Sequence, residues 1–211
     1  MLDLLLETAR FARWADTLPS ARSGEWECDY EHWPDYHAAV AAFIEARPIA
    51  LWSSEETRAV LYAIARDNEI EHLAREVRCR HPEILIELAR ASIHEGEPDA
   101  RWQLAEELGR AGPLSDVEAI LLELARDDAE YVRRRALAAL ARLGSTSAEA
   151  LALEAWDRPD PNQQWARMMA LWCLHRIGSS HLEPKLVEAE HDGREYLAGY
   201  ARKIRNGEID S

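Results

Sequence analysis

Apolar residues recur along this chain at intervals of three and four positions, the spacing that places them on one face of a helix. The alternation of apolar and polar residues that would indicate β-strands is almost absent. Proline and glycine interrupt the pattern at regular places and divide the chain into segments of about 10 to 17 residues, a typical helix length. The sequence therefore predicts an all-α protein.

We expect about six stacked antiparallel helix pairs. They are 2–16 with 34–46, 54–66 with 69–80, 82–94 with 98–111, 115–126 with 129–143, 147–157 with 161–177, and 181–190 with 194–206. Ser54, Ser115 and Ser147 precede acidic residues, as helix N-caps do, and Ser115 has the capping-box spacing to Glu118. Gly144 and Gly178 follow long apolar-periodic runs, as C-terminal caps do.

A repeat appears when the helices are aligned on their closing glycines. The aligned endings are Ala136-x-x-Ala139-Leu140-x-x-Leu143-Gly144, Ala170-x-x-Cys173-Leu174-x-x-Ile177-Gly178 and Leu104-x-x-Glu107-Leu108-x-x-Ala111-Gly112. Successive closing glycines, up to Gly207, stand 32, 34 and 29 residues apart. A single pair cannot bury its apolar stripe, so the pairs must stack on one another.

The segment 128–144 resembles HEAT repeats in the compact bacterial form called lyase-type HEAT-like repeats. In that family an acidic residue opens the second helix, Val-Arg and Ala follow, and the helix ends in Leu-Gly, as Asp128, Val132-Arg133, Ala136 and Leu143-Gly144 do here. The resemblance is clearest over 82–178 and implies one α-solenoid, a HEAT-like superhelix, across 1–211. Residues 1–80, with a long loop at 17–34, would be a divergent N-terminal cap, and 179–211 a C-terminal cap.

Charge bears on the kind of partner. The chain has a net charge of -14, from 39 acidic and 25 basic residues, and residues 1–100 contribute -10 of it. Such a chain repels phosphate backbones, so nucleic acid is an unexpected partner. A basic protein is the favoured one, and the alternative is that the charge only maintains solubility.

Other sequence features bear on compartment and chemistry. The three cysteines, Cys28, Cys79 and Cys173, have no disulfide or zinc spacing, which favours a reducing cytoplasm. No apolar run approaches the roughly 20 residues of a membrane helix. Neither a metal, a cofactor nor a set of catalytic residues is expected, since no known motif for them is present.

The long loop is the first candidate binding site, because acids and large aromatics alternate in it. Its candidate residues are Glu25, Trp26, Glu27, Asp29, Tyr30, Glu31, Trp33 and Asp35. Aromatic side chains anchor interfaces, and acids steer a basic partner. Charge reversal of Glu27, Asp29 and Glu31 is expected to slow association and to leave the fold intact. The alternative is that Trp26 and Trp33 fold back over the first helix and cover the core.

The second candidate site is a row on the second helices of successive pairs. Its candidate residues are Arg101, Trp102, Arg133, Arg134, Trp165 and Arg167. By the family resemblance these helices line the concave side, where the row would bind carboxylates, phosphates or an acidic helix. The alternative is an internal ladder in which each arginine pairs with an acid at a helix start, such as Asp99, Asp128 or Asp160. Four other tryptophans are expected in the core: Trp14, Trp52, Trp156 and Trp172.

Together these features favour a non-catalytic protein-binding scaffold. Its most concrete form is a bacterial immunity or inhibitor protein that neutralises a basic toxin or enzyme through an acidic surface. An adaptor or assembly factor is the first alternative, and the sequence does not distinguish the two. A HEAT-like enzyme of the bilin lyase or DNA glycosylase type is the second, and the glycosylase type would depend on the arginine row.

Overall fold

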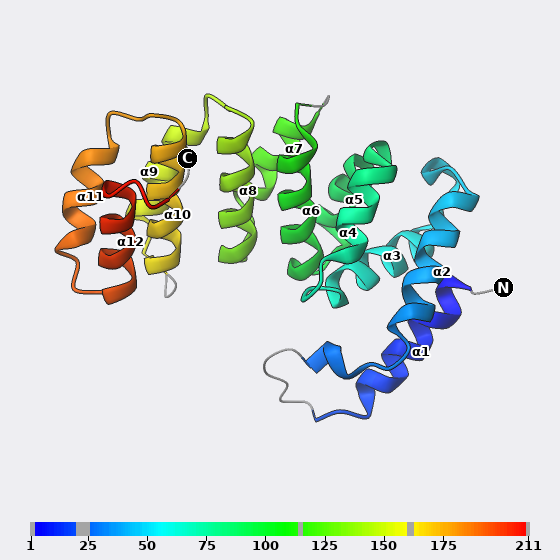
Figure 1. Ribbon diagram of the computed structural model, residues 1–211. Coiled ribbons are helices and arrows are strands. Elements are labelled where there is room, and N and C mark those ends of the chain that lie inside the picture. The colour runs from blue at the N-terminus through cyan, green and yellow to red at the C-terminus, as the bar shows by residue number, and fades with distance from the viewer. Residues whose placement is uncertain (1–2, 20–25, 114–115, 160–162, 210–211) are drawn as a thin grey trace. The chain divides into compact units, whose positions relative to one another are not determined.

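A computed structural model describes residues 3–19, 26–113, 116–159 and 163–209 (Figure 1). Over these residues the protein is all-α, with twelve α-helices, two short 3-10 helices and no strand. The predicted all-α class is therefore confirmed. The helices begin and end within three residues of the predicted bounds, because the breakers and apolar periods that mark them are local signals.

The N-terminal elements are α1 (Leu4–Asp16), η1 (Trp26–Asp29), α2 (Trp33–Ala46), η2 (Ile49–Leu51), α3 (Ser54–Arg66), α4 (His72–Arg80), α5 (Pro82–Glu95) and α6 (Pro98–Ala111). The C-terminal elements are α7 (Val117–Leu124), α8 (Glu130–Arg142), α9 (Ala148–Asp157), α10 (Gln163–Arg176), α11 (Leu182–Glu190) and α12 (Glu195–Arg205).

The chain forms two compact units, 1–107 and 108–211, with the division inside α6. In the first unit α1 packs against α2 and α3, and α5 packs against α3 and α4. In the second unit α7 pairs with α8, α9 with α10, and α11 with α12, each as two helices of opposite direction (Figure 1). There α10 also contacts both α8 and α12, so the second helices of these pairs form one layer. A single continuous array over 1–211 stays a prediction.

The two predicted glycine caps, Gly144 and Gly178, end their helices with the same backbone geometry. At the end of α8, Gly144 has a φ of +70°, its N–H donates to the Ala141 carbonyl at 3.2 Å, and the N–H of Ser145 donates to the Leu140 carbonyl at 3.0 Å. The same pair of bonds follows α10, where Gly178 has a φ of +66°. This is a Schellman cap, which favours glycine because a Cβ is strained at positive φ. Both C-caps are confirmed.

The predicted N-caps were less accurate than the C-caps. Ser53, not Ser54, caps α3: its Oγ accepts from the Glu56 N–H at 3.2 Å, and the Glu56 carboxylate accepts from the Ser53 N–H at 2.7 Å. Ser54 is the first helical residue, so that assignment was wrong by one position. Ser147 precedes α9 but makes no side-chain cap bond. Ser115 lies outside the described residues.

Small residues let neighbouring second helices approach closely in the second unit. Ala136 to Ala141 on α8 are all buried, and a Cβ placed on Gly109 would lie 2.6 Å from the Cβ of Ala139. Of the tryptophans expected in the core, Trp156 is buried, with its indole N–H donating to Glu188 at 2.9 Å. The other three, Trp14, Trp52 and Trp172, are only partly buried.

Candidate functional site

The loop before α2 folds back onto α1 around Phe11, which is fully buried. The Phe11 ring lies 6.1 Å from that of Trp26, 4.7 Å from that of Tyr30 and 5.2 Å from that of Trp33, measured between centroids. The indole N–H of Trp33 also donates to the Glu27 carbonyl at 2.8 Å. The loop aromatics thus form part of the core of the first unit, as the alternative reading of the loop expected.

Glu27 lies inside this unit rather than on its surface. It is 3% exposed, and its Oε1 lies 3.5 Å from Nη1 of Arg66 on α3. Burial raises the pKa of the Glu27 carboxyl above its usual value, although a backbone hydrogen bond and the Arg66 charge both oppose the rise. Charge reversal at Glu27 would bury an unpaired cation beside Arg66, so we now expect it to destabilise the fold, unlike reversal at an exposed acid.

The other loop candidates differ in their accessibility. Tyr30 is buried, which removes it, like Glu27, from direct contact with a partner. Asp29 and Glu31 are exposed, whereas Trp26, Trp33 and Asp35 are half-buried. The Asp35 carboxylate also lies 3.4 Å from Nη1 of Arg10 on α1. Glu25 lies outside the described residues, and partner binding by the exposed part of the loop stays a prediction.

Arg101, Arg133 and Arg167 occupy one recurring position, eleven residues before the closing glycine of their helix. Each donates to a backbone carbonyl at or just after the end of the first helix of its own pair. Nη1 of Arg101 donates to the Gly96 carbonyl. Nη1 of Arg133 donates to the carbonyls of Asp127 and Asp128, both at 2.7 Å. Nε of Arg167 donates to the Trp156 carbonyl at 3.0 Å.

These bonds direct Arg101, Arg133 and Arg167 to the last turn of the first helix of their pair or to the turn that follows it. The last carbonyls of a helix lack intrahelical partners, and a cation there also interacts favourably with the helix dipole. The alternative reading expected these arginines to bond inside the fold, with acids at helix starts; they do bond inside the fold, and backbone carbonyls are among their acceptors. Arg167 also pairs with a carboxylate, that of Asp192, at 2.7 Å. Asp160 lies outside the described residues.

The two candidate tryptophans of the row differ. Trp102 is buried, and its indole N–H donates to Asp99 at 3.3 Å, so it belongs to the core. Trp165, on α10, is 37% exposed and lies beside Tyr196 on α12, which is 67% exposed; their ring centroids are 5.8 Å apart. Sequence reasoning missed Tyr196. The available signal was its place eleven residues before Gly207, where the other repeats have arginine.

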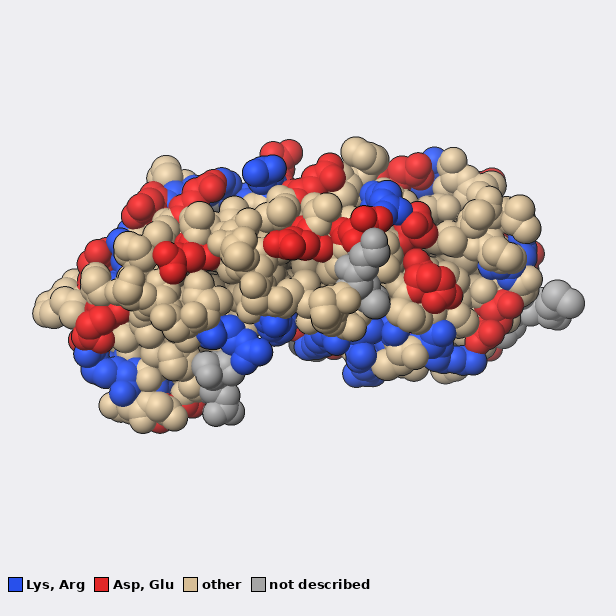
Figure 2. All heavy atoms as spheres, turned by 90° about the horizontal axis from the view of Figure 1, so that it is seen from above, with Lys and Arg blue, Asp and Glu red and all other residues tan. Residues whose placement is uncertain are grey.

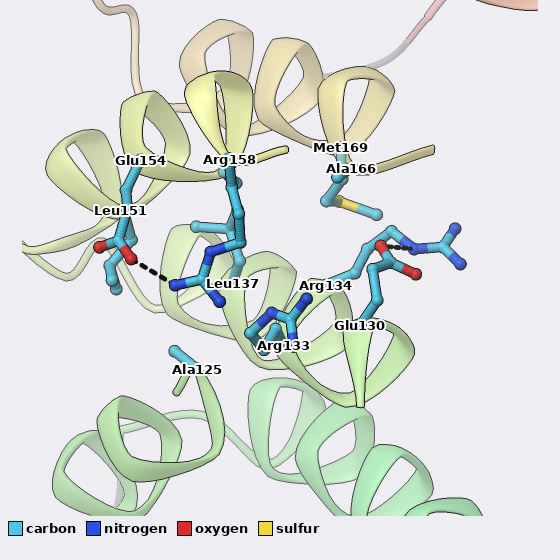
Figure 3. A pocket seen from close by; sticks show the side chains of 11 residues that line it. Ala125, Glu130, Arg133, Arg134, Leu137, Leu151, Glu154, Arg158, Ala166 and Met169 are labelled. Carbon is cyan, nitrogen blue, oxygen red and sulfur yellow. Dashed lines mark hydrogen bonds and ion pairs between the residues drawn. The ribbon is translucent and has the colours of Figure 1, made fainter. Parts of the chain in front are cut away.

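Arg133 and Arg134 line a pocket in the second unit (Figure 3). Its apolar lining is Ala125, Leu137, Leu151, Ala155, Ala166 and Met169. Its charged lining is Glu130, Arg133, Arg134, Glu154 and Arg158. Arg134 pairs with Glu130 at 3.0 Å and Arg158 with Glu154 at 2.5 Å. Sequence reasoning missed Arg158, because it follows a first helix and so stands outside the row.

Other chemical features are sparse. Among the described residues, no group of three or more His, Cys, Asp or Glu side chains is placed to hold a metal ion. Burial raises the pKa of the Cys173 thiol far above its usual value, which makes this cysteine a poor nucleophile. None of the described helices has the length and apolar character needed to cross a bilayer.

Charge on the face drawn in Figure 2 is divided into small groups. Acidic side chains are scattered over it, among uncharged and basic residues. This face therefore carries no single continuous acidic patch, despite the net charge of -14.

Comparison with known proteins bears on the repeated pairs. No curated protein matches the chain. The family model of HEAT repeats matches residues 82–166 and again 117–201, which together span more than half of the chain. The two overlapping matches run from α5 into α12 and include the recurring arginines and the glycine caps at Gly144 and Gly178. The chain belongs to the HEAT-repeat family.

Proposed function

We propose that this protein is a non-catalytic scaffold that binds another protein. HEAT repeats commonly mediate protein–protein interaction. The observation that carries the proposal is the pair Trp165 and Tyr196, two large aromatic side chains that stay exposed on α10 and α12. Aromatic residues of this kind dominate the binding energy of protein interfaces, because they bury much area at a small entropy cost.

The finer form of the proposal is an inhibitor of a basic partner, such as the immunity protein of a bacterial toxin. It is supported by the net charge of -14, which accelerates association with a positively charged protein. An adaptor or assembly factor would use the same surface. The inhibitor and the adaptor differ in whether binding abolishes the activity of the partner.

The test is co-purification of the full-length chain with the products of the adjacent genes. We expect a stoichiometric complex with one of them. The double variant Trp165→Ala/Tyr196→Ala should weaken that complex at least tenfold, since truncation of an interface anchor typically costs about 2 kcal/mol or more of binding free energy. The matched control is Val187→Ala on α11, also exposed and apolar, which should change affinity less than about twofold.

Two outcomes would contradict the proposal. One is the absence of a complex with every neighbouring gene product. The other is turnover of a substrate by the isolated protein. Loss of the partner's activity in the complex would identify an inhibitor, and an active complex would identify an adaptor.

A further inference from the structure

Trp165 and Tyr131 occupy the same position in successive repeats, each thirteen residues before the closing glycine of its helix. Trp165 lies in the first turn of α10 and Tyr131 in the first turn of α8. These two second helices contact each other, so the repeat places an aromatic ring at the same point of two neighbouring helices. What covers the ring in one repeat therefore indicates what the ring in the other can bind.

In α8 the ring is covered by two arginines of its own helix. The guanidinium carbon of Arg134 lies 4.6 Å from the centroid of the Tyr131 ring, and that of Arg135 lies 4.8 Å from it. These arginines follow Tyr131 by three and four positions, the spacing that brings side chains together on one face of a helix. Each contact is a cation–π interaction, in which the quadrupole of the ring attracts the positive charge.

In α10 the same two positions hold Met168 and Met169, so the helix supplies no such cation to Trp165. The Trp165 ring instead lies beside that of Tyr196 on α12, with their centroids 5.8 Å apart and their planes inclined by 34°. Among the residues that the structure describes, no lysine or arginine lies over either ring. Trp165 is 37% exposed and Tyr196 is 67% exposed, so both rings keep surface open to a partner.

The charges beside the two rings do not oppose a further cation. Arg167 and Arg194 both pair with the carboxylate of Asp192, at 2.7 and 2.6 Å. Glu195, which precedes Tyr196, is exposed in the first turn of α12. These two cations and two carboxylates sum to zero, while the net charge of the whole chain is -14. A negative protein attracts cations at long range, which favours a basic over an apolar side chain as the occupant.

We propose that Trp165 and Tyr196 bind an arginine side chain of a basic partner protein. The guanidinium lies over the Trp165 ring beside Tyr196, as that of Arg134 lies over Tyr131 in α8. Arginine suits this place better than lysine, because its planar guanidinium stacks on aromatic rings and is more weakly hydrated than an ammonium group. This inference rests on the proposed scaffold function and specifies the chemistry that the partner presents.

An arginine placed in the chain itself tests whether the Trp165 ring accepts a guanidinium. Met168→Arg puts one three positions after Trp165, as Arg134 stands after Tyr131. In urea unfolding, this substitution should raise the folding equilibrium constant about two- to fivefold more in the wild type than in Trp165→Leu, the effect of one exposed cation–π contact. Met168→Gln, which adds no charge, is the control and should show no such difference. The same effect of Met168→Arg in both backgrounds would overturn the proposal.

A tripeptide probe tests the ring pair without any partner. The probe is acetyl-Gly-Arg-Gly-amide, and the readout is the indole N–H resonance of Trp165, identified by its loss in Trp165→Phe. The internal reference is Trp172 on the same helix, whose ring already lies 5.4 Å from the guanidinium carbon of Arg142. We expect a shift of Trp165 with a dissociation constant on the order of 0.1 M, as one cation–π contact allows. No larger shift at Trp165 than at Trp172 would contradict the assignment.

Two matched probes identify the chemistry of the occupant. Acetyl-Gly-citrulline-Gly-amide has the shape of the arginine probe without its charge, and acetyl-Gly-Lys-Gly-amide has the charge without the planar group. At equal concentration and ionic strength, each should shift Trp165 less than about half as much as the arginine probe does. An equal shift with citrulline would overturn the proposal in favour of an uncharged occupant. An equal shift with lysine would overturn the choice of arginine.

Charge variants test the same site in the complex with the co-purified partner. Met168→Arg should weaken that complex about fivefold, because its guanidinium covers the ring and repels the incoming arginine. Met168→Glu should leave the affinity unchanged or increase it. Val187→Arg, at an exposed position of α11, adds the same charge elsewhere and should change affinity less than about twofold. Equal weakening by Met168→Arg and Met168→Glu would show that bulk rather than charge decides, and would refute the assignment.

The arginine site and the scaffold proposal can fail separately. If Trp165→Ala/Tyr196→Ala weakens a complex that Met168→Arg leaves unchanged, the arginine assignment is wrong and the scaffold stands. If the probes and Met168→Arg behave as described and no gene product forms a complex, the scaffold proposal is wrong and the ring pair remains a guanidinium site.

Discussion

Nε of Arg167, near the start of α10, donates a hydrogen bond of 3.0 Å to the carbonyl oxygen of Trp156 in the last turn of α9. The same guanidinium lies 4.8 Å from the centroid of the Trp156 ring, and its Nη1 donates to Asp192, before α12, at 2.7 Å. One side chain therefore ties together the two helices of a pair and the turn of the next pair. Arg101 and Arg133 make the first of these connections in their own pairs.

Substitution of Arg167 by glutamine should lower the free energy of unfolding by about 1.5 to 3 kcal/mol, the usual contribution of hydrogen bonds to a charged group. The reason is that the substitution leaves the partly buried Asp192 carboxylate and the α9 carbonyl with weaker partners. Urea unfolding measures the change. Arg202→Gln, at an exposed position of α12, serves as control and should stay within about 0.5 kcal/mol. Equal effects of the two would show that the ladder adds no stability.

Two glycines of the second unit should respond in opposite directions to substitution by alanine. Gly144→Ala should destabilise by about 1 to 2 kcal/mol, because its φ of +70° strains any residue with a Cβ. Gly199→Ala should stabilise by about 0.4 to 1 kcal/mol, since it lies inside α12 with no atom within 4 Å of the added Cβ. Thermal unfolding of both variants checks the signs. A stabilising Gly144→Ala would contradict the cap geometry.

The raised pKa of Glu27 gives stability a pH dependence of definite sign. A carboxyl whose pKa is higher in the folded state contributes most below its unfolded pKa, near 4.5, and that contribution is lost as the pH rises through the folded pKa. The free energy of unfolding of the wild type, relative to that of Glu27→Gln, should therefore fall as the pH rises above about 4.5. Urea unfolding at several pH values measures this difference, and a rise with pH would contradict it.

In the loop before α2, charge reversal is a useful test only at the exposed acids, Asp29 and Glu31. Asp29→Lys/Glu31→Lys should leave the melting temperature nearly unchanged, because neither side chain is buried. If the loop steers a basic partner, the double variant should also slow association several-fold and reduce its dependence on salt. Stopped-flow association with the co-purified partner measures both. The same kinetics in the variant would place the interface elsewhere.

The helices and their glycine C-caps were predictable because their causes are local. The apolar period and the two glycines, Gly144 and Gly178, each act within one or two helical turns. The HEAT-repeat pattern in addition implies that successive helix pairs stack on one another. Even here the position of the α3 cap was wrong by one residue, since Ser53 and Ser54 both suit an N-cap and only backbone geometry distinguishes them.

The sequence by itself determined the class of fold, the helix ends and the recurring arginine position. The tertiary structure decided which polar residues are inside and which are accessible. Glu27 is buried by Arg66, 39 positions later in the chain, and Trp165 meets Tyr196 across 31 positions. Burial depends on the side chains that stacked pairs bring together from distant repeats, and a periodic pattern specifies the buried face of a helix without specifying which residues of its neighbours cover it.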